Sequence, residues 1–226
     1  FGVYERATQY MAKEYHGGFL GGALFNIGET LLGAQLTDNM RAVDLLQSLP
    51  FVRPDRIGAT GGSGGGNQTM WLSAMDERIT AAMPVVSVGS FESYVSGVNC
   101  ICELLPDGLT LTEEAGVLAL IAPRPLRIGN ALYDVNPTFA VSEMLRTYGQ
   151  VEELYRKLGV PERIAYTVSP RVHGMTRQQR EAMLGWFELH LKGHGQGGTV
   201  AEGELTVEPE SELRMFRSHA ERPESV

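Results

Sequence analysis

A serine lies at the centre of a glycine run. Gly61-Gly62-Ser63-Gly64-Gly65 has the spacing G-x-S-x-G, which is typical of a sharp turn between a buried strand and a helix. The small flanking residues let strand and helix meet, and the turn lifts the serine hydroxyl clear of the sheet. The backbone N–H of Gly64 would lie at the start of the helix, where it can stabilise a developing oxyanion. The pattern predicts Ser63 as a nucleophile and Gly64 as an oxyanion donor.

Two other interpretations of this glycine run are weaker. A phosphate-binding loop requires a Lys-Ser or Lys-Thr pair after the glycines or a G-x-G-x-x-G register, and neither is found here. A flexible glycine-rich turn without chemistry is the second alternative. It is disfavoured because a strand-like segment precedes the run and a helix-like segment follows it.

A serine nucleophile needs a general base, and the base needs a carboxylate that orients it. In this class of site the chain order is serine, acid, histidine. His173 follows a predicted strand and precedes the last predicted helix, whereas His190 lies late in that helix and is interpreted as a helix-end cation. Asp134 follows the preceding strand and is the predicted acid. Glu92 and Glu103 are kept as alternative acids, because some such sites take the carboxylate from the loop one strand earlier.

The elements that must position these residues alternate between strands and helices. We expect strands near Ile57, Thr80, Leu126 and Ala165. Helices are expected at about 29–49, 68–75, 113–120, 138–158 and 177–192, with Thr176 and Gln179 at capping-box spacing for the last. This alternation predicts an α/β fold whose parallel sheet is covered by helices on both faces, with the site at the carboxyl ends of the strands.

Composition and charge exclude several classes of function. The 226 residues are 43% hydrophobic and 20% charged, as in folded globular proteins. A net charge of −8 argues against nucleic acid as a partner, and the lack of a long apolar run argues against a membrane. Cys100 and Cys102 are separated by one residue, so we expect two small buried thiols and no mutual disulfide. No cluster with metal-ligand spacing is found, and no metal or cofactor is predicted.

The residues around Ser63 resemble a known family. Residues 56–66 resemble the nucleophile segment of acetyl xylan esterase-like members of the dienelactone hydrolase branch of the α/β-hydrolase superfamily. Residues 38–44 and 122–126, the Val172-His173-Gly174 turn and the helix with Gly185-Trp186-Phe187 extend the likeness over about residues 28–192. The resemblance implies hydrolysis of a carboxylic ester without a cofactor, often deacetylation of a polysaccharide. It assigns Ser63, Asp134 and His173 as the triad and favours a secreted or periplasmic location.

The number of strands raises a question of domain organisation. A parallel sheet of four strands leaves an edge and part of both faces uncovered. We therefore expect residues 1–192 to be the carboxyl-terminal portion of an α/β-hydrolase domain and residues 193–226 to be a tail or linker. The missing N-terminal half, with the second oxyanion donor, would then come from another segment or chain. The alternative donor is the His16-Gly17-Gly18 loop, which imitates the His-Gly-Gly loop of some esterases.

Three functions follow from these observations. The first is a serine esterase that forms an acyl-enzyme and acts on a small-molecule or carbohydrate ester. The second is a peptidase of the prolyl oligopeptidase type, which shares the serine turn and the order of the triad. The third is a catalytically inactive binding module with the same fold. The residues that bind the substrate are not identified by the sequence.

Overall fold

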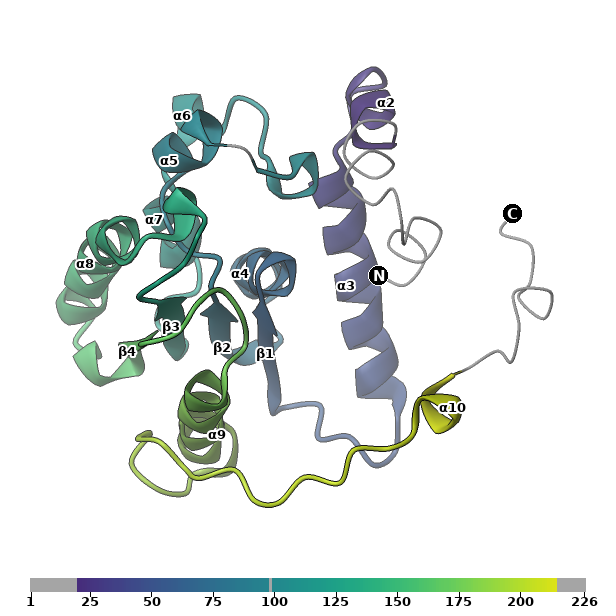
Figure 1. Cartoon of the computed structure of the whole chain (residues 1–226), viewed down its shortest axis with the longest axis vertical. Helices are drawn as coiled ribbons and strands as arrows, with labels where there is room; N and C mark the ends of the chain where they lie inside the picture. The colour runs from purple at the N-terminus through teal and green to yellow at the C-terminus, as the bar shows by residue number, and fades with distance from the viewer. Residues whose placement is uncertain (1–19, 98, 215–226) are drawn as a thin grey trace.

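Four short segments of small and branched residues pair as a parallel sheet. The computed structural model describes residues 20–97 and 99–214 (Figure 1). The strands lie side by side in chain order, and each pair is parallel. They are β1 (Ile57–Gly62), β2 (Ile79–Val85), β3 (Leu126–Ala131) and β4 (Ile164–Ser169). All four predicted strands are confirmed.

Helices cover both faces of this sheet, as Figure 1 shows. On one face the main core joins strand residues such as Ala82 and Ile128 to side chains of three helices: α4 (Gly64–Met75), α7 (Glu114–Ala119) and α8 (Val141–Lys157). On the other face Met83 and Val85 pack with Ala182 of α9 (Arg177–Lys192). β2 is buried almost throughout because helices lie on both sides of it. The predicted fold class is confirmed.

The helix α3 (Leu31–Ser48) lies outside α4 and is tied to it by polar side chains (Figure 1). The Thr30 hydroxyl caps its start by accepting a hydrogen bond from the Gly33 N–H at 2.8 Å. Its buried Asn39 amide donates to Gln68 Oε1 of α4 at 2.5 Å. The helix ends just before Pro50, as the sequence predicts.

Two predicted helix starts need correction. The helix after the serine begins at Gly64 and not at Gln68, because the Ser63 carbonyl already accepts hydrogen bonds from the Gly66 and Asn67 N–H groups. The predicted capping box of α9 does not form. The Thr176 hydroxyl hydrogen-bonds the Ser169 hydroxyl, and the Gln179 amide donates to the Asn130 carbonyl at 2.8 Å. Both side chains link α9 to the strands instead of capping its own backbone.

The segment between β2 and α7 is more ordered than the irregular stretch expected at 87–111. It contains α5 (Phe91–Ser96), the short turn η2 (Ile101–Glu103) and α6 (Gly108–Leu111). The helix expected at 138–158 is divided, because η3 (Pro137–Phe139) precedes α8 and Ala140 between them has an extended ψ of 143°. The remaining short elements are α2 (Gly22–Phe25), η4 (Pro161–Arg163) and α10 (Glu210–Leu213).

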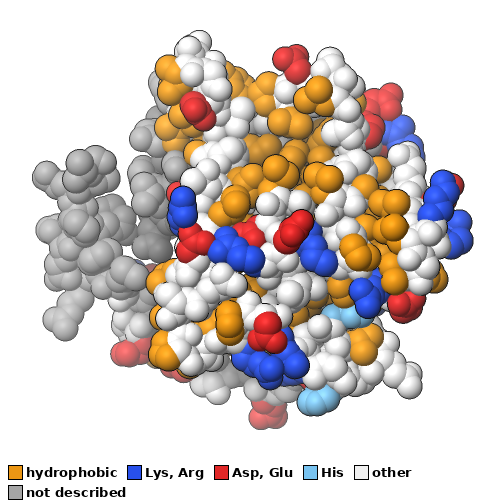
Figure 2. All heavy atoms as spheres, turned by 180° about the vertical axis from the view of Figure 1, so that it is seen from behind, with side chains coloured by type: hydrophobic (Ala, Val, Ile, Leu, Met, Phe, Trp, Pro, Cys, Tyr) orange, Lys and Arg blue, Asp and Glu red, His pale blue; other side chains and the backbone are white. Residues whose placement is uncertain are grey.

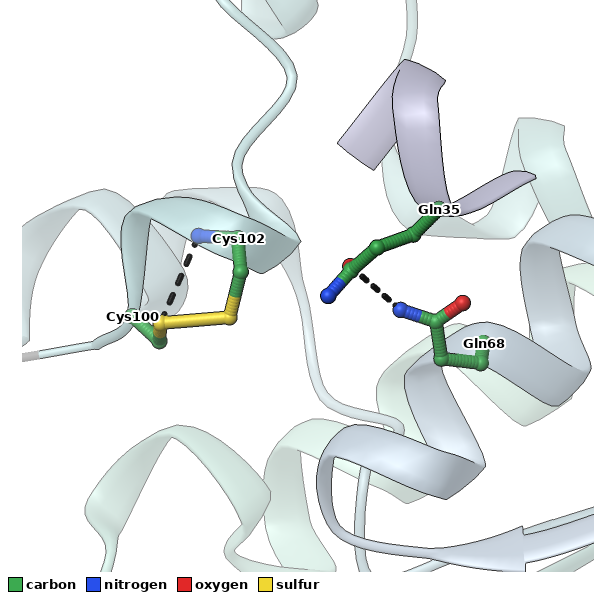
Figure 3. The surroundings of a disulfide bond; sticks show 4 residues. All are labelled: Gln35, Gln68, Cys100 and Cys102. Atoms are coloured by element: carbon green, nitrogen blue, oxygen red, sulfur yellow. Dashed lines mark hydrogen bonds between the residues drawn. A yellow bond between two sulfur atoms is a disulfide. The ribbon is translucent and has the colours of Figure 1, made fainter. Parts of the chain in front are cut away.

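The two cysteines form a disulfide, which corrects the expectation of two separate thiols. Cys100 and Cys102 are bonded across the start of η2, and the bond lies opposite the Gln35 and Gln68 amides of α3 and α4 (Figure 3). The one-residue spacing misled the prediction, since a turn with a Cα–Cα distance of 5.2 Å brings both sulfurs within bonding reach.

The first part of the expected tail packs against α9. The Val200 N–H donates to the Glu181 carbonyl at 3.0 Å, and Arg180 binds both oxygens of Glu202 at 2.7 and 2.6 Å. Gly185 has no side chain, and this allows the Gly198 carbonyl to rest directly on the helix. None of the helices in the described part of the chain combines the length and apolarity needed to cross a membrane.

Candidate active site

Ser63 occupies a strained turn between β1 and α4. Its backbone has φ 58° and ψ −124°, a conformation that side-chain-bearing residues rarely adopt. The Ser63 N–H donates to the Val85 carbonyl of β2 at 2.9 Å, which fixes the turn at the carboxyl end of the sheet. The Ser63 side chain therefore lies just after the carboxyl end of β1, on the residue that immediately precedes α4.

The glycines around Ser63 are required by packing. A Cβ on Gly61 would lie 2.5 Å from the Gly65 carbonyl oxygen. A Cβ on Gly66 would overlap the Ser87 hydroxyl and approach the Val85 carbonyl oxygen to 2.6 Å. Any larger residue at either position would push α4 away from the strands, so the spacing of the motif reflects the close approach of strand and helix.

Asp134 and His173 come from the loops after β3 and β4, and they are in contact. Asp134 Oδ2 lies 2.7 Å from His173 Nδ1, and the Asp134 side chain is only 1% exposed. The other carboxylate oxygen accepts a hydrogen bond from the Asn136 N–H at 2.9 Å. The loops are joined by their backbones, since the Tyr133 N–H donates to the Arg171 carbonyl at 3.0 Å. The structure thus brings together the two residues that the sequence paired.

The His173 loop also reaches the serine turn. Gly174 has φ 144°, which lets the chain reverse after the histidine, and a Cβ on Gly62 would lie 3.4 Å from the Met175 Cβ. The imidazole stacks on Phe139, with ring centroids 5.9 Å apart. Because Nδ1 faces Asp134, Nε2 is the nitrogen left to exchange a proton with a nucleophile.

Phe139 and Asn136 were not identified from the sequence as parts of this site. The available signal was the Asp134-Val135-Asn136-Pro137 segment, whose Asp and Asn favour side-chain-to-backbone turns. Both residues form such turns here, because Asp134 accepts from the Asn136 N–H and Asn136 from the Thr138 N–H. The position of the Phe139 ring depends on where this loop packs, and no local pattern indicates it.

Glu92 and His190, two further residues considered from the sequence, have other partners. Glu92 is exposed on α5 and pairs with Arg146 at 2.9 Å, away from the imidazole. His190 packs against Trp186 with ring centroids 4.1 Å apart. Burial lowers the pKa of His190, which favours the neutral ring and corrects its interpretation as a helix-end cation.

Glu103, the other alternative acid, lies beside the serine turn, and the carboxylate that pairs with His173 Nδ1 is that of Asp134. A Cβ placed on Gly64 would be 3.2 Å from Glu103 Oε1. Within the described residues its carboxyl has no hydrogen-bond or ion-pair partner. Burial raises the pKa of Glu103 to about 7. The neighbouring Glu114 is fully buried, and burial raises its pKa to about 8.

A cavity of about 260 Å³ opens next to Glu103. Its walls are mostly apolar and come from α5, α6 and the segment between them, including Phe91, Tyr94 and Leu105. Val95, Leu109 and Leu111 of the same region are exposed hydrophobic residues. The space-filling view in Figure 2 shows hydrophobic side chains gathered over the upper half of one face of the molecule.

Two expectations concern groups other than Ser63, Asp134 and His173. In the part of the chain that the structure describes, no group of three or more His, Cys, Asp or Glu side chains could hold a metal ion. The His16-Gly17-Gly18 loop, the alternative source of the second oxyanion donor, lies outside the described residues.

Sequence comparisons match parts of the chain to hydrolases. The prolyl oligopeptidase family model matches residues 6–100, which include Ser63. A curated relative, a putative hydrolase named YtaP from Bacillus subtilis (strain 168), is 30% identical over 102 residues. That match covers 43% of this chain and 34% of the relative, so the chain spans about a third of its length.

Several solved structures with similar folds carry esterase names. A family 15 glucuronoyl esterase from Caldicellulosiruptor kristjansonii has a TM-score of 0.61 at 19% identity, covering 79% of this chain and 55% of that one. Methylesterase BT1017 has a TM-score of 0.60 at 25% identity, covering 80% and 40%. A putative acetyl xylan esterase from Bacteroides fragilis NCTC 9343 has a TM-score of 0.58 at 19% identity, covering 74% and 43%.

These structural matches extend over most of this chain. In each similar protein, the matched region makes up roughly half of a longer chain. In this chain the matched region includes a parallel sheet with helices on both faces. The chain therefore has the α/β-hydrolase fold.

Proposed function

We propose that this chain carries the catalytic centre of a serine carboxylic-ester hydrolase that works through an acyl-enzyme. The observation that carries the proposal is the combination of the strained Ser63 turn with the Asp134–His173 pair at the neighbouring strand ends. A general base oriented by a buried carboxylate is what activates a serine hydroxyl, which is otherwise a weak nucleophile.

The proposed reaction has two similar halves. Ser63 Oγ attacks the ester carbonyl carbon while its proton passes to His173 Nε2, and the carbonyl electron pair moves to oxygen. The Gly64 N–H stabilises this oxyanion. His173 then protonates the departing alcohol, and the C–O bond breaks to leave an acyl-enzyme. Water, deprotonated by His173, repeats the attack and releases the acid and Ser63.

We infer a carbohydrate ester, with acetyl as the leading acyl group, as the substrate class. The support is the resemblance to acetyl xylan esterase-like proteins together with the esterase names among the similar structures. The peptidase alternative is retained because the prolyl oligopeptidase model matches the segment that contains Ser63.

The test compares three substrates with one variant. The purified protein should hydrolyse p-nitrophenyl acetate and release acetate from acetylated oligosaccharides, while a proline-containing amide should not react. Ser63→Ala should abolish turnover and labelling by a fluorophosphonate probe without unfolding the protein, since it removes one oxygen from a partly exposed side chain. A wild-type protein that the probe does not label would support the inactive binding module. Faster cleavage of the amide than of the esters would support the peptidase.

A further inference from the structure

The Glu103 carboxyl lies beside Gly64 and has no partner among the described residues. Its Oε1 atom is 3.2 Å from the position of a Cβ on Gly64, which puts it within about 6 Å of the Gly64 nitrogen by covalent geometry. An oxyanion bound to that N–H would lie about 2.9 Å from the nitrogen. Both groups would then lie within about 6 Å of one backbone nitrogen, on the residue after Ser63.

Among residues 20–97 and 99–214, no cation pairs with the Glu103 carboxyl. Within the described residues its carboxyl has neither a hydrogen-bond nor an ion-pair partner. The neighbours near this turn on α3 and α4 are the neutral amides of Gln35 and Gln68 (Figure 3). On the α7 side the buried carboxyl Glu114 interacts electrostatically with Glu103, and Asp107 lines the same cavity.

The two protonation states of Glu103 would act in opposite ways. An ionised carboxylate would repel a developing oxyanion and compete with it for the Gly64 N–H at the helix start. A neutral carboxylic acid would donate a hydrogen bond, and a buried acid kept neutral is a known form of oxyanion donor. The apolar cavity beside Glu103 favours the neutral form.

We propose that Glu103 is a catalytic residue that, as a neutral acid, donates a hydrogen bond to the oxyanion formed when Ser63 attacks the ester. The inference rests on the proposed function. Glu103 keeps its proton throughout, while the proton of Ser63 still passes to His173. The pKa of about 7 at Glu103 agrees with this role, because the acid form is then populated at and below neutral pH.

The experiment measures kcat/KM for p-nitrophenyl acetate between pH 5.5 and 9.5. The wild-type value should fall above about pH 7 as Glu103 ionises. Glu103→Gln keeps a donor that does not ionise, so the alkaline fall should vanish while the value at pH 6 stays within about tenfold of wild type. Glu103→Leu removes the donor and should lower kcat/KM by roughly 10²–10³-fold. Glu92→Gln, which changes an exposed carboxyl nearby, is the matched control and should leave the profile unchanged.

Either of two outcomes would overturn the inference. One is a kcat/KM of Glu103→Leu within threefold of the wild-type value. The other is a fall in kcat/KM at alkaline pH that persists in Glu103→Gln. Thermal unfolding of each variant shows whether it is folded. The unfolding midpoint of Glu103→Leu should be no lower than that of wild type, because the substitution removes a buried carboxyl that has no partner among the described residues.

A second measurement separates this inference from the proposed function. The rate at which a fluorophosphonate phosphonylates Ser63 depends on the same oxyanion site but needs no ester turnover. If the probe labels wild type and no ester is hydrolysed, the proposed function is wrong. The inference then stands if Glu103→Leu slows labelling by roughly 10²-fold or more, and it falls if labelling is unchanged.

Discussion

Two carboxyl groups lie at the site, and they differ in their hydrogen-bond partners. The Asp134 side chain has almost no exposed surface, and each of its carboxylate oxygens faces a nitrogen, one on the His173 ring and one on the Asn136 backbone. Glu103 faces Gly64 with no partner among the described residues, and burial raises the pKa of its carboxyl to about 7. The difference shows that hydrogen-bond donors decide whether a buried carboxyl acts as an acceptor or is kept neutral.

The largest expected effect on activity comes from replacing Asp134, the carboxylate that accepts hydrogen bonds. Asp134→Asn should lower kcat by roughly 10⁴-fold, because an amide would hold the wrong tautomer of the imidazole. Steady-state kinetics of the variant beside Glu103→Gln checks this prediction. If Asp134→Asn were nearly silent and Glu103→Gln lost several orders of magnitude, the roles of the two carboxyls would have to be exchanged.

A smaller effect is expected on stability from Glu114, the buried carboxyl next to Glu103. Burial raises the pKa of Glu114 in the folded protein to about 8, above the ordinary value of 4.5 for a glutamic acid. The folded state therefore binds the proton more tightly, and this contribution is complete below pH 4.5 and is lost as pH rises towards 8. Wild-type stability should fall with pH across this window, at up to about 1.4 kcal/mol per pH unit.

Glu114→Gln should reduce that slope to the part contributed by Glu103, whose pKa is also raised, and the amide can still accept the hydrogen bond from the Gly89 N–H. Urea unfolding of both proteins at several pH values between 5 and 9 measures it. Glu113→Gln is the matched control on the neighbouring residue, whose carboxylate caps backbone N–H groups. A variant that keeps the wild-type slope would show that Glu114 is ionised in the folded protein.

The smallest effect is expected from the Cys100–Cys102 disulfide. It closes a very short loop, so its loss should cost on the order of 1–2 kcal/mol. For a chain of this size that corresponds to a fall of roughly 2–8 °C in the unfolding midpoint. Scanning calorimetry of the Cys100→Ser/Cys102→Ser double variant checks this prediction. The bond spans the start of the turn that carries Glu103, so a larger loss of activity than of stability would show that it positions this carboxyl.

The sequence by itself determined the framework and the order of the triad candidates. Each strand is a short run of small and branched residues, and Pro50 ends a helix by local rules. The glycine spacing around Ser63 predicts the turn, because the close approach of β1 and α4 leaves no room for a Cβ at Gly61. These are effects of residues near one another in the chain, and a sequence pattern records them directly.

Only the tertiary structure decided which carboxyl meets which partner. Asp134 and His173 are 39 residues apart, and Glu103 and Gly64 are likewise far apart in the chain. Their contacts depend on how the loops after the strands pack, and local propensity does not encode that packing. The capping box at Thr176 was wrong for the same reason, since Ser169 and Asn130 of the neighbouring strands supplied other partners. Burial, which sets the charge of Glu103, Glu114 and His190, exists only once the chain has folded.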